Sequence, residues 1–167
     1  MSKNAFLEGM SRAASSVSAV TTGGESGKAG VTVSSMCSVS AEPPMLLVCI
    51  HHQSPACQAI RNNGVFCVNM LRHDQSSISD LFAGRSDKPN KFLDADWSKG
   101  LTGAPKLKNS LVNFDCHLVA EYRAGSHFVF IGGVAEINIS EGKPLLYGSR
   151  LYGHPSYFDK ENKIDDP

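Results

Sequence analysis

The sequence predicts a mainly β fold whose antiparallel strands close into a barrel. Six or seven segments carry the apolar runs or the alternation of strands, and most connections between them are short. The last third of the chain places no helix between its strands, which excludes a doubly wound parallel sheet. Antiparallel meanders of this kind usually close into a barrel. With 167 residues, 41% of them apolar, the chain is long enough for one core, and we expect a single domain over 1–167.

The first half of the chain supplies most of the expected helices. The expected elements are a helix through Phe6, Met10, Ala13 and Val17, strands at 17–22, 29–33, 45–52 and 65–71, and helices at 55–63 and 74–83. A glycine-rich turn joins the first two strands into a hairpin. Ser54 and Pro55 begin the second helix and Gly64 ends it, whereas Asp74 is the expected N-cap of the third helix and Gly84 its end.

The second half of the sequence predicts an irregular segment followed by a long β-hairpin. Residues 85–109 are polar and contain two prolines, so we expect no regular structure there. Apolar and polar residues then alternate over 111–122, which predicts a long half-buried strand. A second long strand is expected at 127–139 after a tight turn at Ala124 and Gly125, and a short one at 145–147. The residues from about 159 onward are polar and are expected to be loose.

Composition excludes several classes of protein. Sixteen basic residues balance sixteen acidic ones, which gives no reason to expect nucleic acid or an anionic membrane surface as a partner. No apolar run approaches the ~20 residues of a membrane helix, and no signal-peptide pattern follows the first Met. The five cysteines are scattered without a C-x-x-C or zinc-ligand pattern. This cysteine usage suits a reducing cytoplasm, where we expect the protein to lie.

Two segments suggest sites for a ligand. Ser54 and Pro55 begin a helix directly after a strand, and the free N–H groups of such a helix start can bind a phosphate. The run Val-Thr-Val-Ser-Ser-Met-Cys-Ser-Val-Ser at 31–40 brings small hydroxyl residues to a strand end, where backbone can approach a flat ligand. Each segment alone has an ordinary structural interpretation, as a capped helix or as a polar loop.

Two further signals are equally weak alone. His127 follows Gly125 and Ser126 at a hairpin turn, where it can orient a substrate, although a lone histidine is more often structural. Lys91 precedes Phe92 in the irregular region and can pair with a phosphate, although most lysines are simply solvated.

Together these segments resemble the short-chain flavin reductases, the reductase components of two-component monooxygenases of the 4-hydroxyphenylacetate 3-monooxygenase and phenol hydroxylase type. The resemblance rests on the run at 31–40, a double proline before an apolar strand, and His-His-Gln-Ser-Pro at 51–55. Phe-Cys-Val-Asn-Met-Leu at 66–71, Lys91 with Phe92, Gly-Ser-His at 125–127 and a tyrosine-bearing C-terminal segment complete it. It covers about residues 10–153, which we take as the core of the domain.

The resemblance implies a flavin-binding split β-barrel that forms a homodimer. It further implies NAD(P)H-dependent reduction of FMN or FAD, with reduced flavin passing to a separate oxygenase. His127 would be the catalytic-site residue that meets the nicotinamide nucleotide. The residues implied in cofactor binding are Thr32, Val33, Ser34, Ser35, Ser38, Val39, Cys49, Ile50, His51, Ser54, Pro55, Ala56, Asn69, Lys91, Phe92, His127, Tyr152, Gly153 and His154.

The mechanism that the resemblance implies needs no nucleophile and no metal. Hydride passes directly from nicotinamide C4 to flavin N5, so the protein only stacks the two rings about 3.5 Å apart and excludes water. One residue departs from the family pattern, because Ser126 stands where the family has an acidic residue. Serine carries no charge, which leaves the choice between NADH and NADPH open.

Three alternatives remain at this stage. The chain could be a reductase of the same fold in another pathway, such as corrin reduction, or a flavin- or haem-binding module without activity. It could also bind a metal through His51 and His52, but neighbouring residues of one strand point to opposite faces, so this pair is a poor site.

Overall fold

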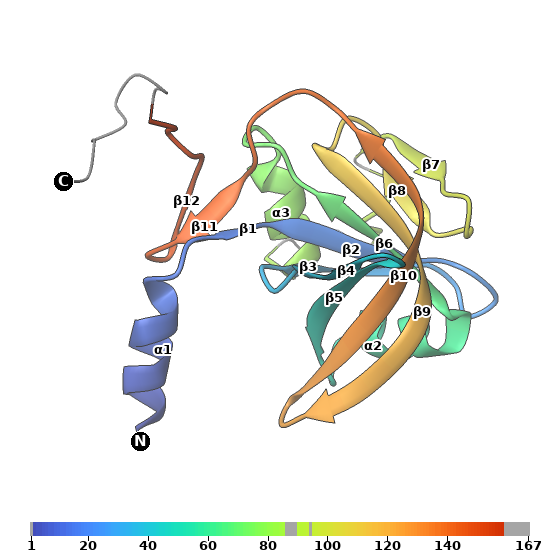
Figure 1. Ribbon diagram of the computed structural model, residues 1–167, viewed down its shortest axis with the longest axis horizontal. Helices are drawn as coiled ribbons and strands as arrows, with labels where there is room; N and C mark the ends of the chain where they lie inside the picture. Colours follow the sequence, from blue (N-terminus) through green and yellow to red (C-terminus); the bar gives the residue numbers. More distant parts are fainter. Residues whose placement is uncertain (1, 86–89, 94, 159–167) are drawn as a thin grey trace.

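The computed structural model describes residues 2–85, 90–93 and 95–158. Within them lies a seven-stranded antiparallel sheet in the order β3-β2-β6-β9-β10-β5-β4 (Figure 1). Its strands are β2 (Ser18–Thr22), β3 (Ala29–Val33), β4 (Cys37–Ala41), β5 (Pro44–His51), β6 (Val65–Met70), β9 (Val112–Ala124) and β10 (His127–Ile139). The mainly β, antiparallel fold class predicted from the sequence is confirmed.

The sheet curls into an open barrel rather than a closed one. Strands β3 and β4 stand at the two ends of the hydrogen-bonded order, and the curl brings β3 beside β5. Just past the end of β3, the Ser35 hydroxyl bonds to both the N–H and the carbonyl oxygen of Cys49 on β5, each at 3.0 Å. A side chain therefore links the two strands where no backbone ladder joins them.

The barrel encloses the main hydrophobic core. Phe66, Phe130, Ile50 and Val48 lie in it with at most 1% of their surface exposed. Gly132 on β10 faces this core, since a Cβ there would lie 2.5 Å from the Phe66 ring. A second apolar cluster, which includes Leu81, Phe82 and Leu107, packs beneath the helix α3 (Ser76–Phe82).

Helix α2 (Pro55–Asn63) matches the sequence prediction residue for residue. Ser54 occupies the N-cap position, Pro55 the first turn, and Gly64 ends the helix with φ +67°, a conformation that favours glycine. Arg61 fixes the helix to the long hairpin through an ion pair with Glu121 at 2.8 Å, and its guanidinium lies over the Phe128 ring.

The other two helices differ from prediction. Helix α1 (Lys3–Ser11) is shorter than expected, and none of its residues is buried, so Phe6 and Met10 face solvent. Figure 1 shows it standing apart from the barrel, beside the short strands β11 (Leu146–Gly148) and β12 (Leu151–Gly153). Helix α3 has Gln75, not Asp74, at its N-cap, because the Asp74 carboxylate pairs with Arg72 at 2.8 Å instead.

Five short strands were missed by the sequence analysis. Strand β4 occupies part of the run interpreted as a hydroxyl-rich loop, and β7 (Trp97–Lys99) pairs with β8 (Pro105–Leu107) inside the region expected to be irregular. Strand β12 pairs with β11, which also pairs with β1 (Ser15–Ser16). Tertiary contacts, rather than periodicity, specify strands this short. The expectation for residues from 159 onward lies outside the described residues.

Candidate functional site

Three adjoining cavities follow strand β3 and form one continuous groove, which we call the β3 groove. Cavities of about 430, 260 and 190 Å³ share residues along this strand: Val31 lines the first two, and Thr32, Val33 and Ser34 line the last two. Most residues implied in cofactor binding lie in this groove. The predicted members that line it are Thr32, Val33, Ser34, Ser35, Cys49, Ile50, His51, Ser54, Pro55, Lys91, Phe92, His127 and Tyr152.

One end of the β3 groove is built for an anion. Ser54 and Pro55 bring the start of the nine-residue helix α2 to this cavity, and the Ser54 hydroxyl makes no capping hydrogen bond. Lys91 lies on the same wall, with its ammonium 5.8 Å from the centre of the Phe82 ring. Pro55 has no N–H and Cys57 N already donates to Ser54 O at 2.9 Å, so the helix start offers the Ala56 N–H. This N–H, the Ser54 hydroxyl and the Lys91 ammonium are a suitable donor set for a phosphate.

The middle of the groove offers mainly backbone. The Thr32 hydroxyl donates to the carbonyl oxygen of Ser79 at 2.6 Å, and the Ser35 hydroxyl is held by Cys49. The side chains of Val33 and Ile50 are buried in the core. Ser34 is exposed, so the groove presents this one hydroxyl together with strand-end backbone, which a flat ring can approach closely.

Two histidines, His51 and His127, line the far end of the groove, and His52 adjoins them. The β5–β10 register pairs His127 with His51, and their rings meet edge to face with centroids 5.1 Å apart. The hydroxyl of Ser126 lies 3.0 Å from Nδ1 of His127, so this serine can orient the imidazole. The rings of His51 and His52 stack at 4.9 Å, because β5 ends at His51; the prediction that these side chains point to opposite faces is therefore wrong.

Tyr152 closes the smallest cavity of the groove. Its hydroxyl donates to the Asp80 carboxylate at 2.8 Å and lies 2.9 Å from the Ser79 hydroxyl. Burial, and to a lesser extent the Asp80 carboxylate, raise the pKa of this phenol above its ordinary value. Tyr152 is therefore neutral at physiological pH, and its one hydroxyl hydrogen is donated to Asp80.

Several predicted binding residues lie elsewhere. The Asn69 side chain is completely buried: its Nδ2 donates to Ala19 O at 2.9 Å, and its Oδ1 accepts from Leu107 N at 2.8 Å. The structure thus gives Asn69 a structural role, because its amide is occupied inside the sheet. Ser38 and Val39 line a separate apolar groove, defined below.

The remaining predicted residues lie near the groove without lining its cavities. Ala56 is buried in the first turn of α2, where only its backbone can serve a ligand. Gly153 ends β12 next to Tyr152, and the ring of His154 meets that of His73 with centroids 5.7 Å apart.

The sequence analysis missed further residues of the groove. Lys28, on the β2–β3 turn, adds a second ammonium to the anion end, and Tyr147 joins Tyr152 in the smallest cavity. Arg85 also lines that cavity and pairs with Asp80 at 3.2 Å. These residues come together at β3 only when the chain folds. The glycine-rich turn around Lys28 was the one sequence feature that could have indicated a binding role for Lys28.

Three of the five cysteines are buried thiols with raised pKa values. All five are free thiols, and Cys57, Cys67 and Cys116 are buried. Burial raises the pKa of each of these three thiols, to about 12 for Cys116. Among the described residues, no cluster of three or more His, Cys, Asp or Glu side chains could hold a metal ion. None of the described helices is long and apolar enough to cross a membrane.

Comparison with known proteins identifies the class to which this fold and groove belong. Residues 10–156 match the flavin reductase like domain, so the chain belongs to the flavin reductase family. It is 43% identical over 149 residues to FMN reductase (NADH) RutF 1 of Methylorubrum extorquens, covering 89% of this chain and 74% of the relative. It is 38% identical to RutF of Acinetobacter baylyi, covering 92% and 82%. The resemblance inferred from the sequence is confirmed.

Solved structures of flavin reductases share the fold. The structure is similar to flavin reductase PheA2, with TM-score 0.87 and 33% identity, over 94% of this chain and all of that one. It is also similar to BorF, the flavin reductase component of a bacterial two-component tryptophan halogenase, with TM-score 0.84, 30% identity and coverage of 92% and 98%.

Proposed function

We propose that this protein is an NADH:FMN oxidoreductase that supplies reduced flavin to a separate oxygenase component. The observation that carries the proposal is the β3 groove, which joins a phosphate-binding end to a histidine-lined end along one strand. The relatives support it, since they are named as NADH-dependent FMN reductases and as the reductase component of a two-component halogenase.

The chemistry of the groove fits a flavin mononucleotide. Its phosphate would lie at the start of α2, with Ser54 and Lys91 as donors. The ring would lie against the strand-end backbone at 32–35, near Cys49 and His51. When bound, the flavin accepts a hydride at N5 from the nicotinamide, and the chain supplies only position and shielding from water.

His127 and Tyr152 would position the nicotinamide nucleotide. His127 reaches the groove at the ring end, where the Ser126 hydroxyl fixes its orientation. Tyr152, whose one hydroxyl hydrogen is donated to Asp80, offers its ring and an acceptor oxygen from the other side of β3. We therefore assign His127 an orienting hydrogen bond rather than a proton transfer.

The activity assay is NADH oxidation at 340 nm with and without FMN, FAD or riboflavin. We expect oxidation that depends on added or bound flavin, with NADH preferred over NADPH. A protein that binds flavin but oxidises neither nucleotide would refute the reductase function and leave a flavin-binding module. Adding a corrin as the final acceptor tests the alternative pathway in the same cuvette.

We also propose that the protein is a homodimer with one domain per chain and works in the cytoplasm. Support for the dimer comes from an apolar groove of about 390 Å³, the β4 groove, lined by residues that include Met36, Val39 and Phe114, and from exposed Tyr122 and Ile139. The free thiols suit a reducing compartment. Sedimentation equilibrium tests the dimer, because a monomer at micromolar concentration would refute it.

A further inference from the structure

The smallest cavity of the β3 groove is left free by the flavin of the proposed function. FMN would fill the two larger cavities, with its phosphate at the start of α2 and its ring near His51. The remaining cavity, of about 190 Å³, is lined by residues that include Tyr147, Tyr152 and Arg85, and we call it the tyrosine cavity. Because it shares residues 32–34 with the ring end, a nicotinamide nucleotide whose reactive ring stacks on the flavin can extend into it.

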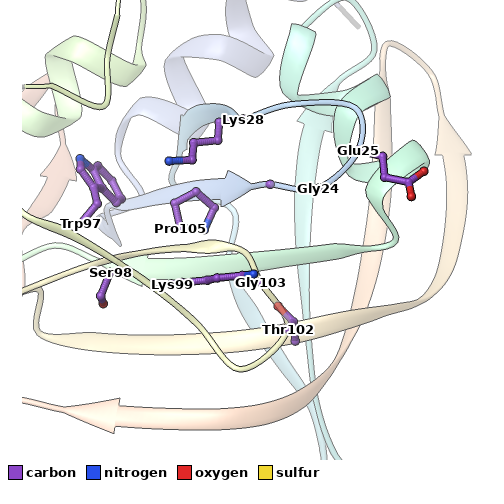
Figure 2. Close-up of a pocket in the computed structure, with 10 residues that line it drawn as sticks. Gly24, Glu25, Lys28, Trp97, Ser98, Lys99, Thr102, Gly103 and Pro105 are labelled. Atoms are coloured by element: carbon purple, nitrogen blue, oxygen red, sulfur yellow. The ribbon is translucent and has the colours of Figure 1, made fainter.

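The cations of the groove are divided between its ends. Lys28 and Lys91 line the anion end. Figure 2 shows Lys28 beside Trp97 and Pro105, two residues of the β7–β8 hairpin. Arg85 is the one charged residue that lines the tyrosine cavity in the described part of the chain. The charge that a nucleotide meets in this cavity is therefore set by Arg85 and by the groups that contact it.

Arg85 is paired with Asp80 of helix α3. Oδ1 of Asp80 accepts from Nη1 of Arg85 at 3.2 Å and from the hydroxyl of Tyr152 at 2.8 Å. None of the described residues donates to Oδ2 of the same carboxylate, and 42% of the side chain is exposed. Asp80 therefore stands beside the tyrosine cavity with one carboxylate oxygen open to a ligand.

Hydrogen bonds hold Asp80 in place against strand β3. The Thr32 hydroxyl donates to the carbonyl oxygen of Ser79 at 2.6 Å, which ties α3 to the strand. The Ser79 hydroxyl lies 2.9 Å from that of Tyr152. The backbone N–H of Arg85 donates to the carbonyl oxygen of Asp80 at 3.0 Å, so the two charged side chains leave neighbouring points of the backbone. The fold thus positions the carboxylate before a ligand binds, which reduces the cost of binding.

The ion pair of Asp80 and Arg85 can distinguish two nucleotides that differ by one phosphate. NADH carries a 2′-hydroxyl on its adenosine ribose, which donates well to a carboxylate, whereas the 2′-phosphate of NADPH is accommodated by an arginine. Here the Asp80 carboxylate repels a phosphate and also occupies the Arg85 guanidinium. Ser126, at the other end of the groove, is uncharged and adds no such discrimination.

We propose that Asp80 determines the preference for NADH over NADPH, with the adenosine ribose at the edge of the tyrosine cavity and its 2′-hydroxyl donating to Oδ2 of Asp80. The inference rests on the proposed function, because the flavin must occupy the rest of the β3 groove. The pairing with Arg85 is part of the assignment, since it withholds the cation that a 2′-phosphate requires.

The test compares Asp80→Asn with Asp74→Asn, a matched loss of one carboxylate, since Asp74 pairs with Arg72 at 2.8 Å outside the groove. The quantity measured is kcat/KM for NADPH divided by kcat/KM for NADH, at saturating FMN. We expect Asp80→Asn to raise this ratio about tenfold, because Arg85 becomes free to bind the 2′-phosphate. Added salt should reduce the gain, since these charges are exposed. Asp74→Asn should leave the ratio unchanged, and Asp80→Glu should keep the preference for NADH.

A second substitution tests the pairing itself. Adding Arg85→Gln to Asp80→Asn should cancel the gain, because the cation that receives the 2′-phosphate is removed. A gain that survives the loss of Arg85 would overturn the assignment. So would an unchanged ratio in Asp80→Asn, which would place the ribose elsewhere, or an equal rise in Asp74→Asn, which would show a general effect of net charge.

Failure of the proposed function would give a different result. If the protein oxidised neither nucleotide with any flavin, the reductase function would fail, but calorimetry with 2′-phospho-AMP and with AMP would still test Asp80. Tighter binding of 2′-phospho-AMP to Asp80→Asn than to the unchanged protein, with equal binding of AMP, supports the assignment. Equal binding of 2′-phospho-AMP to both proteins refutes it.

Discussion

The substitution Asn69→Ala tests whether Asn69, a predicted binding residue, contacts the ligand or stabilises the fold. The Asn69 amide joins three elements: it donates to Ala19 O on β2 at 2.9 Å and accepts from Leu107 N on β8 at 2.8 Å. It also accepts from Nδ2 of Asn113 on β9 at 2.8 Å. No atom of its side chain reaches the surface, since the residue is 0% exposed.

The loss of folding free energy depends on which partners of Asn69 lose their only hydrogen bond. Nδ2 of Asn113 retains two acceptors, Leu107 O at 3.1 Å and the Ser110 hydroxyl at 2.7 Å. The backbone N–H of Leu107 has no second partner among the described residues, and a buried unsatisfied donor costs about 1–3 kcal/mol. With the lost donor bonds and the small cavity, we expect the free energy of unfolding to fall by about 2–4 kcal/mol.

Urea denaturation measures the loss of stability, and quenching of flavin fluorescence measures FMN binding by the folded protein. We expect Asn69→Ala to bind FMN normally but to unfold at a lower urea concentration. The control Asn62→Ala, on the exposed face of α2, should change neither FMN affinity nor stability. A tenfold loss of FMN affinity with unchanged stability would refute the reasoning, because it would show that Asn69 contacts the ligand.

Three further predictions follow from the site and the core. Lys91→Ala should weaken FMN about tenfold and leave riboflavin, which has no phosphate, unchanged; equal loss of both would contradict a phosphate contact. His127→Ala should raise the KM for NADH with unchanged FMN affinity, whereas His73→Ala should keep wild-type kinetics, as steady-state assays can show. Burial raises the pKa of Cys116 from 9.0 to about 12, so the neutral thiol of the folded state contributes stability that is fully present below pH 9. The free energy of unfolding should therefore decline by up to about 4 kcal/mol between pH 9 and 12. The decline should be shallower in Cys116→Ala. Urea melts across that range check the last expectation, and an equally steep decline in both proteins would refute it.

The sequence predicted those elements whose signals are local. Helix α2 was predicted at both ends because Ser54, Pro55 and Gly64 each act within one turn. The spacing of Phe6 and Met10 predicted that α1 exists, although it ends at Ser11 rather than near Val17. The same pattern could not show that this face meets nothing within the described chain.

Elements that depend on contacts between distant parts of the chain could not be predicted from the local sequence. Strands β7 and β8 have three residues each, too few for any periodicity, and the turn between them depends on the buried Asp115. Asn69 lay in a motif shared with flavin reductases, and its residue type alone could not distinguish a buried amide from a ligand contact.

The register of the long hairpin determines where the redox end of the groove lies. Pairing of β10 with β5 places His127 opposite His51, and a slip of one residue would turn the imidazole to the other face of the sheet. Two backbone features fix that register near the turn: His52 N donates to Ser126 O at 2.9 Å, and Gly125 adopts φ +58°. The Ser126 hydroxyl then meets Nδ1 of His127, so the same turn that sets the register also orients the ring. Because a neutral serine positions the ring, we expect nucleotide binding at this end to depend less on salt than it would with an aspartate. The variant Ser126→Asp tests this, since its KM for NADH should depend more steeply on ionic strength.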